Sequence, residues 1–316
     1  MHCINVGQGD STLLEFPCGA VLIDAGAQDN AARTNLIRYL STFFARRTDL
    51  QNTLQSIIIT HNHQDHTHAL RAIAEQFRVK RYIDNGQTNQ AANAVWIRTN
   101  TFPPGQQIII RQILDTDTAP SGLTDSDIDP LSCARCDPKI TLLSGQKKVK
   151  PLGWSQEEFE NKNYHSIVVR VDFGKAGFLF SGDLELPAIE MLLAKYSGTP
   201  LLDVDVYHVG HHGSANGTTN TFLTAMSPAL AVISVGKFNS PDTRTFGHPR
   251  FSAFKQLKTA ISSKRTPVIF VPIANSVNSF QVRQVSKNIW ATAWDTNILV
   301  TATLDGIRSV ARKSRP

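Results

Sequence analysis

The stretch that decides the fold is His61-Asn62-His63-Gln64-Asp65-His66, which directly follows the apolar run Ser56-Ile57-Ile58-Ile59-Thr60. Such a run predicts a strand buried on both faces, so the histidines begin where a strand ends. Imidazole and carboxylate groups together suit zinc, iron or manganese. Because positions i and i+2 do not share a helix face, we expect a loop in which His61 and His63 face one metal and Asp65 and His66 face its neighbour. Four of the chain's 10 histidines lie between positions 61 and 68, which argues against chance scatter.

Two further polar segments also follow predicted strands. Asp183 ends the segment Ser181-Gly182-Asp183 and could bridge two metals. The pair His211-His212 follows the apolar stretch 203–209 and is itself followed by Gly213-Ser214. Strands are rigid elements that can aim side chains placed at their ends. These segments therefore complete the pattern that residues 61–66 begin.

The rest of the chain alternates strand-like and helix-like segments, which predicts an α/β fold with two similar layers. Apolar spacing predicts one helix with Leu36, Leu40 and Phe43 on a single face and a second with Leu70, Ile73 and Phe77. We expect strands at 3–6, 11–16, 19–26, 166–173, 177–180, 203–209, 229–235 and 268–271, a helix at 186–196, and a closing hairpin from 297 that turns at 305–306. Residues 85–160 are loop-like and are expected to form an insertion near the site.

The motifs, taken in order, resemble the metallo-β-lactamase fold, an αββα sandwich of two mixed sheets with helices on the outer faces. Within that superfamily the chain resembles the ComEC-type hydrolase domain of bacterial competence proteins and its stand-alone relatives. The resemblance implies a single domain over residues 1–316. It rests on Val6-Gly7-Gln8-Gly9-Asp10-Ser11, Leu22-Ile23-Asp24-Ala25-Gly26, Thr60 to His66, Ser181-Gly182-Asp183, Val209 to Ser214, Phe246-Gly247-His248-Pro249 and the hairpin Ile298 to Arg308.

The resemblance also implies a role for each residue of the metal site. His61 and His63 would bind the first of two divalent ions, zinc or manganese, and Asp65 with His66 would bind the second. Asp183 would bridge the two ions. Asp65 and Asp183 would thus be the catalytic carboxylates.

Two ligand positions are less constrained by the motifs. For the second metal we expect His211 rather than His212, because His211 lies nearer the strand end. For the first metal we expect His165 as the third ligand, although ComEC-type relatives often have Asn or Ser at that place. Asp24 is expected to support the site from behind rather than to bind metal.

Two divalent ions close together activate a water and stabilise the charge that develops in an in-line displacement. The resemblance therefore implies a metal-dependent phosphodiesterase or nuclease that acts through a hydroxide held between the metals. His212, Ser214 and His248 would contact substrate or support the ligands. Alternatives are hydrolysis of a small ester (a phosphorylcholine-type diester, a lactone or a lactam) and a metal-binding interaction module without hydrolytic activity.

Charge and composition add weaker information about partners and location. The net charge of +6 is compatible with nucleic acid as the substrate. No apolar run approaches the roughly 20 residues needed to cross a bilayer, and the first residues do not have the pattern of a secretory signal. We therefore expect a cytoplasmic protein with no membrane segment.

The four cysteines are too few for a disulfide scaffold. Cys133 and Cys136 form a C-x-x-C pair, which is half of a structural zinc site, and no second pair with suitable spacing follows. Cys3 and Cys18 flank a predicted hairpin and are expected to be buried small apolar residues.

Overall fold

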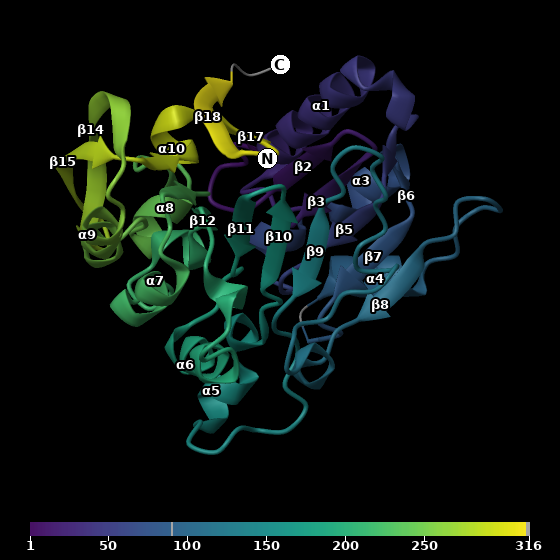
Figure 1. Cartoon of the computed structure of the whole chain (residues 1–316), viewed down its shortest axis with the longest axis horizontal. Coiled ribbons are helices and arrows are strands. Elements are labelled where there is room, and N and C mark those ends of the chain that lie inside the picture. The colour runs from purple at the N-terminus through teal and green to yellow at the C-terminus, as the bar shows by residue number, and fades with distance from the viewer. Residues whose placement is uncertain (90, 314–316) are drawn as a thin grey trace.

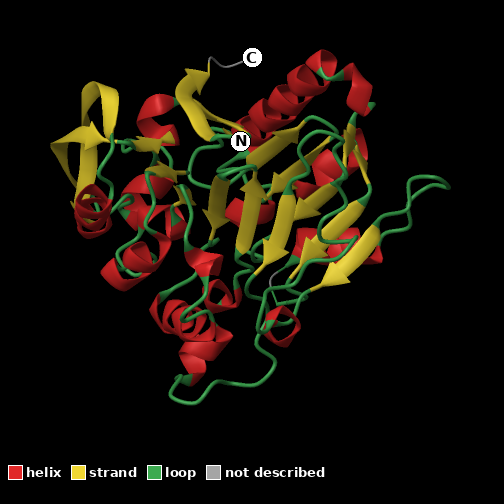
Figure 2. Ribbon diagram, viewed as in Figure 1, coloured by secondary structure: helices red, strands yellow, loops and turns green. Residues whose placement is uncertain are grey.

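The computed structural model describes residues 1–89 and 91–313, which form two stacked β-sheets with helices on the outer faces (Figures 1 and 2). This architecture confirms the expected αββα sandwich. The first sheet has the strand order β18-β17-β1-β2-β3-β5-β7-β8. Its strands are β1 (His2–Cys3), β2 (Thr12–Phe16), β3 (Gly19–Ile23), β5 (Ser56–Ile58), β7 (Arg81–Asp84), β8 (Ile109–Gln112), β17 (Asn297–Thr303) and β18 (Gly306–Lys313).

The second sheet has the strand order β16-β13-β12-β11-β10-β9. Its strands are β9 (Lys139–Leu142), β10 (Val169–Phe173), β11 (Ala176–Phe180), β12 (Val206–His208), β13 (Leu230–Ile233) and β16 (Ile289–Ala291). Two small sheets pair β4 (Thr53–Leu54) with β6 (Arg78–Val79) and β14 (Lys264–Ser276) with β15 (Ser279–Lys287).

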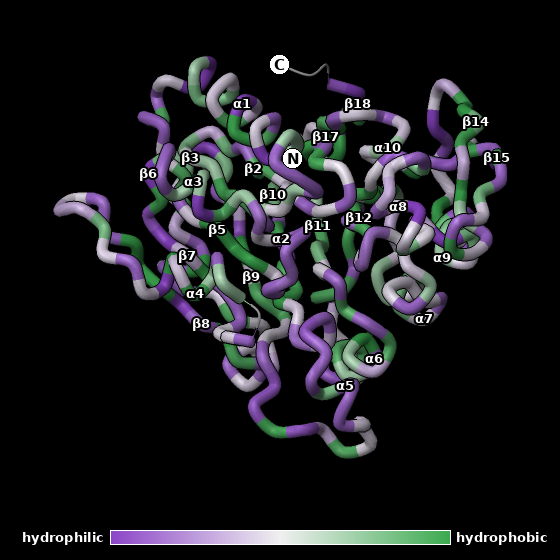
Figure 3. The backbone as a smooth tube through the Cα atoms, turned by 180° about the vertical axis from the view of Figure 1, so that it is seen from behind, coloured by the Kyte–Doolittle hydropathy of each residue, from purple (hydrophilic) through white to green (hydrophobic). Residues whose placement is uncertain are grey.

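Helices cover the outer face of each large sheet, and the central strands are mostly hydrophobic (Figure 3). One apolar core lies between the sheets, and two more lie under the helices. The helices are α1 (Asn30–Arg46), α2 (Gln64–Thr67), α3 (Leu70–Gln76), α4 (Ala92–Thr99), α5 (Gln156–Glu160), α6 (Leu186–Lys195), α7 (Asn220–Met226), α8 (Pro241–Phe246), α9 (Phe251–Ala260) and α10 (Thr292–Asp295).

The first helix shows how the sequence determines these layers. Asp29 caps α1, since its Oδ1 accepts a hydrogen bond of 2.7 Å from the backbone N–H of Ala32. Leu36, Leu40 and Phe43 are buried against the first sheet, as their spacing predicts. The helix thus buries one apolar stripe and exposes the opposite face.

Parallel pairing brings the carboxyl ends of several strands to one edge of the sandwich. β3 pairs parallel with β5 in the first sheet, and β11, β12 and β13 are parallel neighbours in the second. A hydrogen bond of 2.8 Å from the backbone N–H of Ile167 to the carbonyl of Thr60 joins the two sheets at this edge. Every polar segment singled out in the sequence follows one of these strands.

Residues 85–160 are built into both sheets. They supply β8 at the edge of the first sheet and β9 at the edge of the second, and they contain α4. The expectation of a loop-like insertion therefore missed two edge strands. Both strands are short, and β8 is largely exposed, so their apolar pattern is weak.

The cysteines are arranged differently from the prediction. Cys18 and Cys133 form a disulfide across 115 residues. Cys18 is therefore not a free thiol, and Cys133 is not available to bind zinc together with Cys136. Cys3 is buried and free, as expected. The expected cytoplasmic location stays a prediction. Within the described residues, no helix combines the length and apolar character that crossing a bilayer requires.

Candidate metal centre

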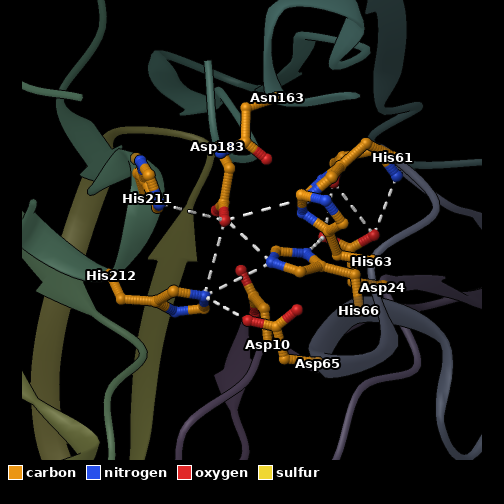
Figure 4. Close-up of polar contacts among 12 residues, drawn as sticks. Asp10, Asp24, His61, His63, Asp65, His66, Asn163, Asp183, His211 and His212 are labelled. Atoms are coloured by element: carbon orange, nitrogen blue, oxygen red, sulfur yellow. Dashed lines mark hydrogen bonds and ion pairs between the residues drawn. The ribbon is translucent and has the colours of Figure 1, made fainter. Parts of the chain in front are cut away.

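The residues that follow β5 form a loop and then a single helical turn. His61 and His63 lie in the loop, whereas Asp65 and His66 lie in α2. The Nε2 atom of His61 is 3.0 Å from Nδ1 of His63, so the two imidazoles face each other (Figure 4). The expected loop at a strand end is therefore present, with a helical turn at its second half.

Carboxylate and imidazole atoms from both sheets converge in front of this loop (Figure 4). Asp183, just after β11, lies at the centre, with its Oδ1 atom 3.3 Å from Nε2 of His66 and its Oδ2 atom 3.8 Å from Nε2 of His61. Within each of two groups, the potential ligand atoms all lie within 4.8 Å of one another, and Asp183 belongs to both. The groups are His61, His63 and Asp183, and Asp65, His66, Asp183 and His212.

Asp24, which is completely buried, holds the outward-facing ring nitrogen of His66 directly and that of His61 through Thr60. Nδ1 of His66 donates to Oδ2 of Asp24 at 2.8 Å. The hydroxyl of Thr60 donates to the same oxygen at 2.8 Å, and Nδ1 of His61 is 3.2 Å from that hydroxyl. These bonds place the lone pairs of both Nε2 atoms toward the centre, as in metal-bound histidines. Asp24 thus lies behind the imidazoles, and its supporting role stays a prediction.

Charge at the centre is balanced within the cluster. Burial alone would raise the pKa of Asp183, but the neighbouring His66 and His212 hold it well below its usual range. Burial alone would lower the pKa of His212, but Asp183 and Asp65 raise it to about 9. The carboxylates therefore require positive charge beside them. Divalent cations would provide that charge in place of the imidazole protons.

The backbone of Asp65 is held by a turn near the N-terminus whose role the sequence did not reveal. The carbonyl of Asp65 accepts a hydrogen bond of 3.0 Å from the backbone N–H of Asp10. A Cβ atom at Gly26 would lie 1.6 Å from this same carbonyl, so only glycine fits there. Asp10 is buried, and its Oδ2 atom is 3.4 Å from Nδ1 of His208. The Gly7-Gln8-Gly9-Asp10 motif was the available signal for this contact.

His165, which the sequence predicts as a ligand, does not face the centre in this structure. Its Nδ1 accepts a hydrogen bond of 3.1 Å from the backbone N–H of Lys147, and its Nε2 is 2.7 Å from the carbonyl of Phe159. Both ring nitrogens therefore face the backbone. Asn163, two residues earlier, points into the space beside Asp183 instead (Figure 4).

His212, rather than the expected His211, lies in one of the two groups of candidate ligand atoms. Nε2 of His212 lies 3.1 Å from Oδ2 of Asp65, and its Nδ1 is 2.8 Å from the carbonyl of Ser234. Both histidines have left-handed backbone conformations, with φ of 48° and 51°, which is unusual for side-chain-bearing residues and is concentrated at functional sites. This turn directs His212 into the centre and leaves His211 on the wall, where its Nε2 is 3.8 Å from Asp183.

Glu185 holds the wall that contains Asn163 and His211. Its Oε1 accepts a hydrogen bond of 2.6 Å from Nδ2 of Asn163 and lies 3.4 Å from Nδ1 of His211. Its Oε2 accepts one of 2.9 Å from Nδ2 of Asn216. Because the Asn163 amide donates to Glu185, its oxygen faces the centre.

The centre opens into a cavity of about 480 Å³. His248 lines this cavity, and its ring lies 6.2 Å from that of His212. Ser214 does not line it. Its hydroxyl donates to Oδ1 of Asn216 at 2.6 Å and accepts from the backbone N–H of Gly217, so it stabilises the loop after His212.

The donors at this centre fit two divalent cations. Oδ1 of Asn163 is buried and has no hydrogen-bond partner, which is energetically unfavourable. A cation beside this oxygen would provide the missing partner. His61, His63 and Asn163 with Asp183 could hold one ion, and Asp65, His66 and His212 with Asp183 the other. Imidazole and carboxylate ligands suit zinc, iron or manganese.

Comparisons with known proteins agree with this description. A profile of the Metallo-beta-lactamase superfamily matches residues 4–237. The chain is 26% identical over 82% of its length to competence protein ComA of Neisseria gonorrhoeae, and 24% identical over 75% of its length to ComE operon protein 3 of Bacillus subtilis. It spans only 30% and 28% of those two proteins. Among solved structures, the metallo-beta-lactamase fold protein YhfI of Bacillus subtilis aligns with 90% of this chain and 98% of its own, at 12% identity and a TM-score of 0.46.

Proposed function

The chain belongs to the metallo-beta-lactamase superfamily, and on that premise we propose that it is a metal-dependent phosphodiesterase that acts on nucleic acid. The observation that carries this proposal is the shared carboxylate of Asp183, which stands between two sets of ligand atoms. One carboxylate with one set on each side is an arrangement suited to a pair of ions rather than to one.

The protein's own residues would hold the reacting groups in place. When bound, two divalent ions supply an activated water and positive charge for the displacement at phosphorus. Asp24 and Thr60 orient the imidazoles, so little reorganisation is needed when substrate arrives. His211, on the cavity wall and 20% exposed, is placed to donate a hydrogen bond to a non-bridging phosphate oxygen.

Three features support nucleic acid as the substrate class. The net charge is +6, and one of the relatives named above is a competence protein. A second cavity of about 250 Å³ adjoins the first at Gln28, which lines both, and its wall includes Lys237. An extended substrate could therefore continue from the centre past Gln28.

A small ester remains the second candidate because of one observation. Among the described residues, neither lysine nor arginine lines the cavity at the centre. Polyanion sites ordinarily provide such cations beside the backbone. The two candidates differ in what the purified protein cleaves.

The test is a cleavage panel with zinc or manganese. Single- and double-stranded DNA and RNA are incubated beside bis(p-nitrophenyl) phosphate, with Asp65→Asn as the inactive variant. Asp242→Asn, which changes the same charge on the same cavity wall outside both ligand sets, is the matched control. We expect cleavage of nucleic acid by the wild type and the control but not by Asp65→Asn. Cleavage of the small diester alone would refute nucleic acid as the substrate.

A further inference from the structure

Phe246 is an aromatic residue on the wall of the metal cavity that the proposed chemistry does not use. It is the last residue of α8, and its side chain is 51% exposed. Single exposed apolar residues are common on protein surfaces and carry no meaning by themselves. Among the large hydrophobic residues exposed in the described part of the chain, however, Phe246 alone lines this cavity.

Three nearly parallel rings lead from the surface toward the candidate ligands. The ring of Phe246 is stacked on His248 with 6.1 Å between centroids and 28° between planes. His248 is in turn stacked on His212 at 6.2 Å and 26°. Because Phe246, Asp65 and Asp183 line the same cavity, a flat molecule placed against Phe246 would share that cavity with a phosphate at the centre.

The helix that carries Phe246 is fixed at both of its ends. The hydroxyl of Ser240 caps α8 by accepting from the backbone N–H of Thr243, and Gly247 ends the helix in the left-handed conformation. Nε2 of Gln8 lies 3.5 Å from Nδ1 of His248. This contact joins the ring of His248 to the N-terminal turn that also hydrogen-bonds the Asp65 carbonyl. These contacts fix the backbone position from which the ring of Phe246 projects toward the cavity.

The guanidinium of Arg250 donates a hydrogen bond of 3.1 Å to the backbone carbonyl of Phe246. Among the described residues, the other side chains that line the cavity with Phe246 include amides, imidazoles and carboxylates but no lysine or arginine. Gln28 and Gln64 present amides to the cavity, and Asp242 lies one helical turn before Phe246. Amides can both donate to and accept from the edges of nucleobases. An aromatic face with amides around it suits a nucleobase. Binding of an acyl chain would require an apolar wall, and binding of a polyphosphate would require cations.

We propose that Phe246 is the stacking platform for the base of a nucleotide whose phosphate lies at the metal centre. This inference rests on the proposed function and narrows its substrate class. A base inside a duplex is already stacked on both sides, so the platform requires an unpaired nucleotide. The preferred substrate is therefore single-stranded nucleic acid, or a strand with an unpaired end or loop.

The test compares two esters that differ only in the presence of a nucleoside: thymidine 5′-(p-nitrophenyl) phosphate and methyl p-nitrophenyl phosphate. Phe246→Leu keeps an apolar side chain and removes the aromatic face, and Phe246→Trp keeps a face. Stacking of one base on an aromatic ring corresponds to about a 5-fold to 150-fold change in affinity. We expect Phe246→Leu to raise KM for the thymidine ester by a factor in this range, to leave kcat unchanged, and to change the methyl ester less than about 2-fold.

Phe246→Trp should retain the preference for the thymidine ester. An equal loss on both esters, or no loss on the thymidine ester, would overturn the inference while leaving the hydrolytic function intact. Binding of thymidine 5′-monophosphate, measured against inorganic phosphate, separates the two proposals if neither ester is cleaved. Binding of the nucleotide that Phe246→Leu weakens would then support the platform and refute the phosphodiesterase. Equal binding to the wild type and to Phe246→Leu would refute the platform.

Discussion

Asp24→Asn is the substitution that most sharply probes how the centre is built. The Oδ1 atom of Asp24 accepts a hydrogen bond of 2.8 Å from the backbone N–H of Thr60. Its Oδ2 atom accepts bonds of 2.8 Å from the Thr60 hydroxyl and from Nδ1 of His66. An asparagine amide must turn its NH₂ group toward one of these donors. If it faces His66, the imidazole proton moves to Nε2, and the lone pair that faces the centre is lost.

Two separate effects are expected from this change. Loss of an outer hydrogen bond to a metal-bound histidine lowers metal affinity about 10- to 100-fold, which corresponds to about 1.4 to 2.7 kcal/mol. Placing an N–H opposite a buried donor costs a further ~1–3 kcal/mol in the free energy of unfolding. Because Asp24 contacts His66 directly, Asp24→Asn should weaken binding mainly of the ion held by Asp65, His66 and His212.

Calorimetric titration of the metal-free protein with manganese measures the first effect, and chemical unfolding without metal measures the second. Asp295→Asn is the control, since Asp295 is equally buried but pairs with Arg265 outside both ligand sets. It should lower stability and leave both metal affinities unchanged. If Asp24→Asn binds two ions as tightly as the wild type, the assignment of Asp24 as the residue that orients His66 is refuted.

The remaining predictions concern Asn163 on the cavity wall, the disulfide and the stability of the protein in acid. Asn163→Ala should weaken retention of one metal about tenfold in a chelator competition, whereas His165→Ala should lower Tm and leave metal binding intact; the reverse result would restore His165 as the ligand. Reduction of Cys18–Cys133, which joins residues 115 apart, should lower the free energy of unfolding by about 2–4 kcal/mol, and an unchanged denaturation midpoint would contradict the bond. Burial lowers the pKa of His2 to about 4, so the unfolded chain binds the proton first as pH falls from about 6.5. The wild type should therefore lose up to about 3 kcal/mol of stability between pH 7 and pH 4 that His2→Gln does not lose, as unfolding at each pH would show.

The part of the site that depends on local spacing could be predicted from the sequence. Residues 61–66 and Asp183 follow buried strands, and parallel neighbours bring such ends to one edge. The apolar period of α1 likewise placed Leu36, Leu40 and Phe43 in the core. These features depend on periodicity and on strand ends, which a single sequence records directly.

Turn geometry accounts for what spacing could not predict. His211 is nearer its strand than His212, but two successive left-handed residues reverse which side chain faces the centre. Asn163 and His165 share one turn of 3-10 helix, Lys162–His165, in which residues two apart point in different directions. The sequence predicts a candidate ligand in each turn, whereas only the backbone conformation shows which side chain faces the centre.

Contacts between segments that lie far apart in the sequence could not be predicted from the sequence pattern either. The disulfide joins Cys18 in the first hairpin to Cys133 in the stretch between β8 and β9. The contact of Asp10 with the Asp65 carbonyl depends on the close approach that Gly26 allows. Nothing in local periodicity encodes either pairing.

The central claim is that two metal sites share Asp183, and the electron paramagnetic resonance spectrum of the manganese-loaded protein tests it most directly. With the metal content measured in the same sample, the wild type should hold two Mn²⁺ ions per chain and give the spectrum of a spin-coupled pair. Asp183→Asn should abolish the coupling and reduce the content to one ion or fewer. One ion per chain in the wild type, or two uncoupled ions that Asp183→Asn does not affect, would contradict the shared centre.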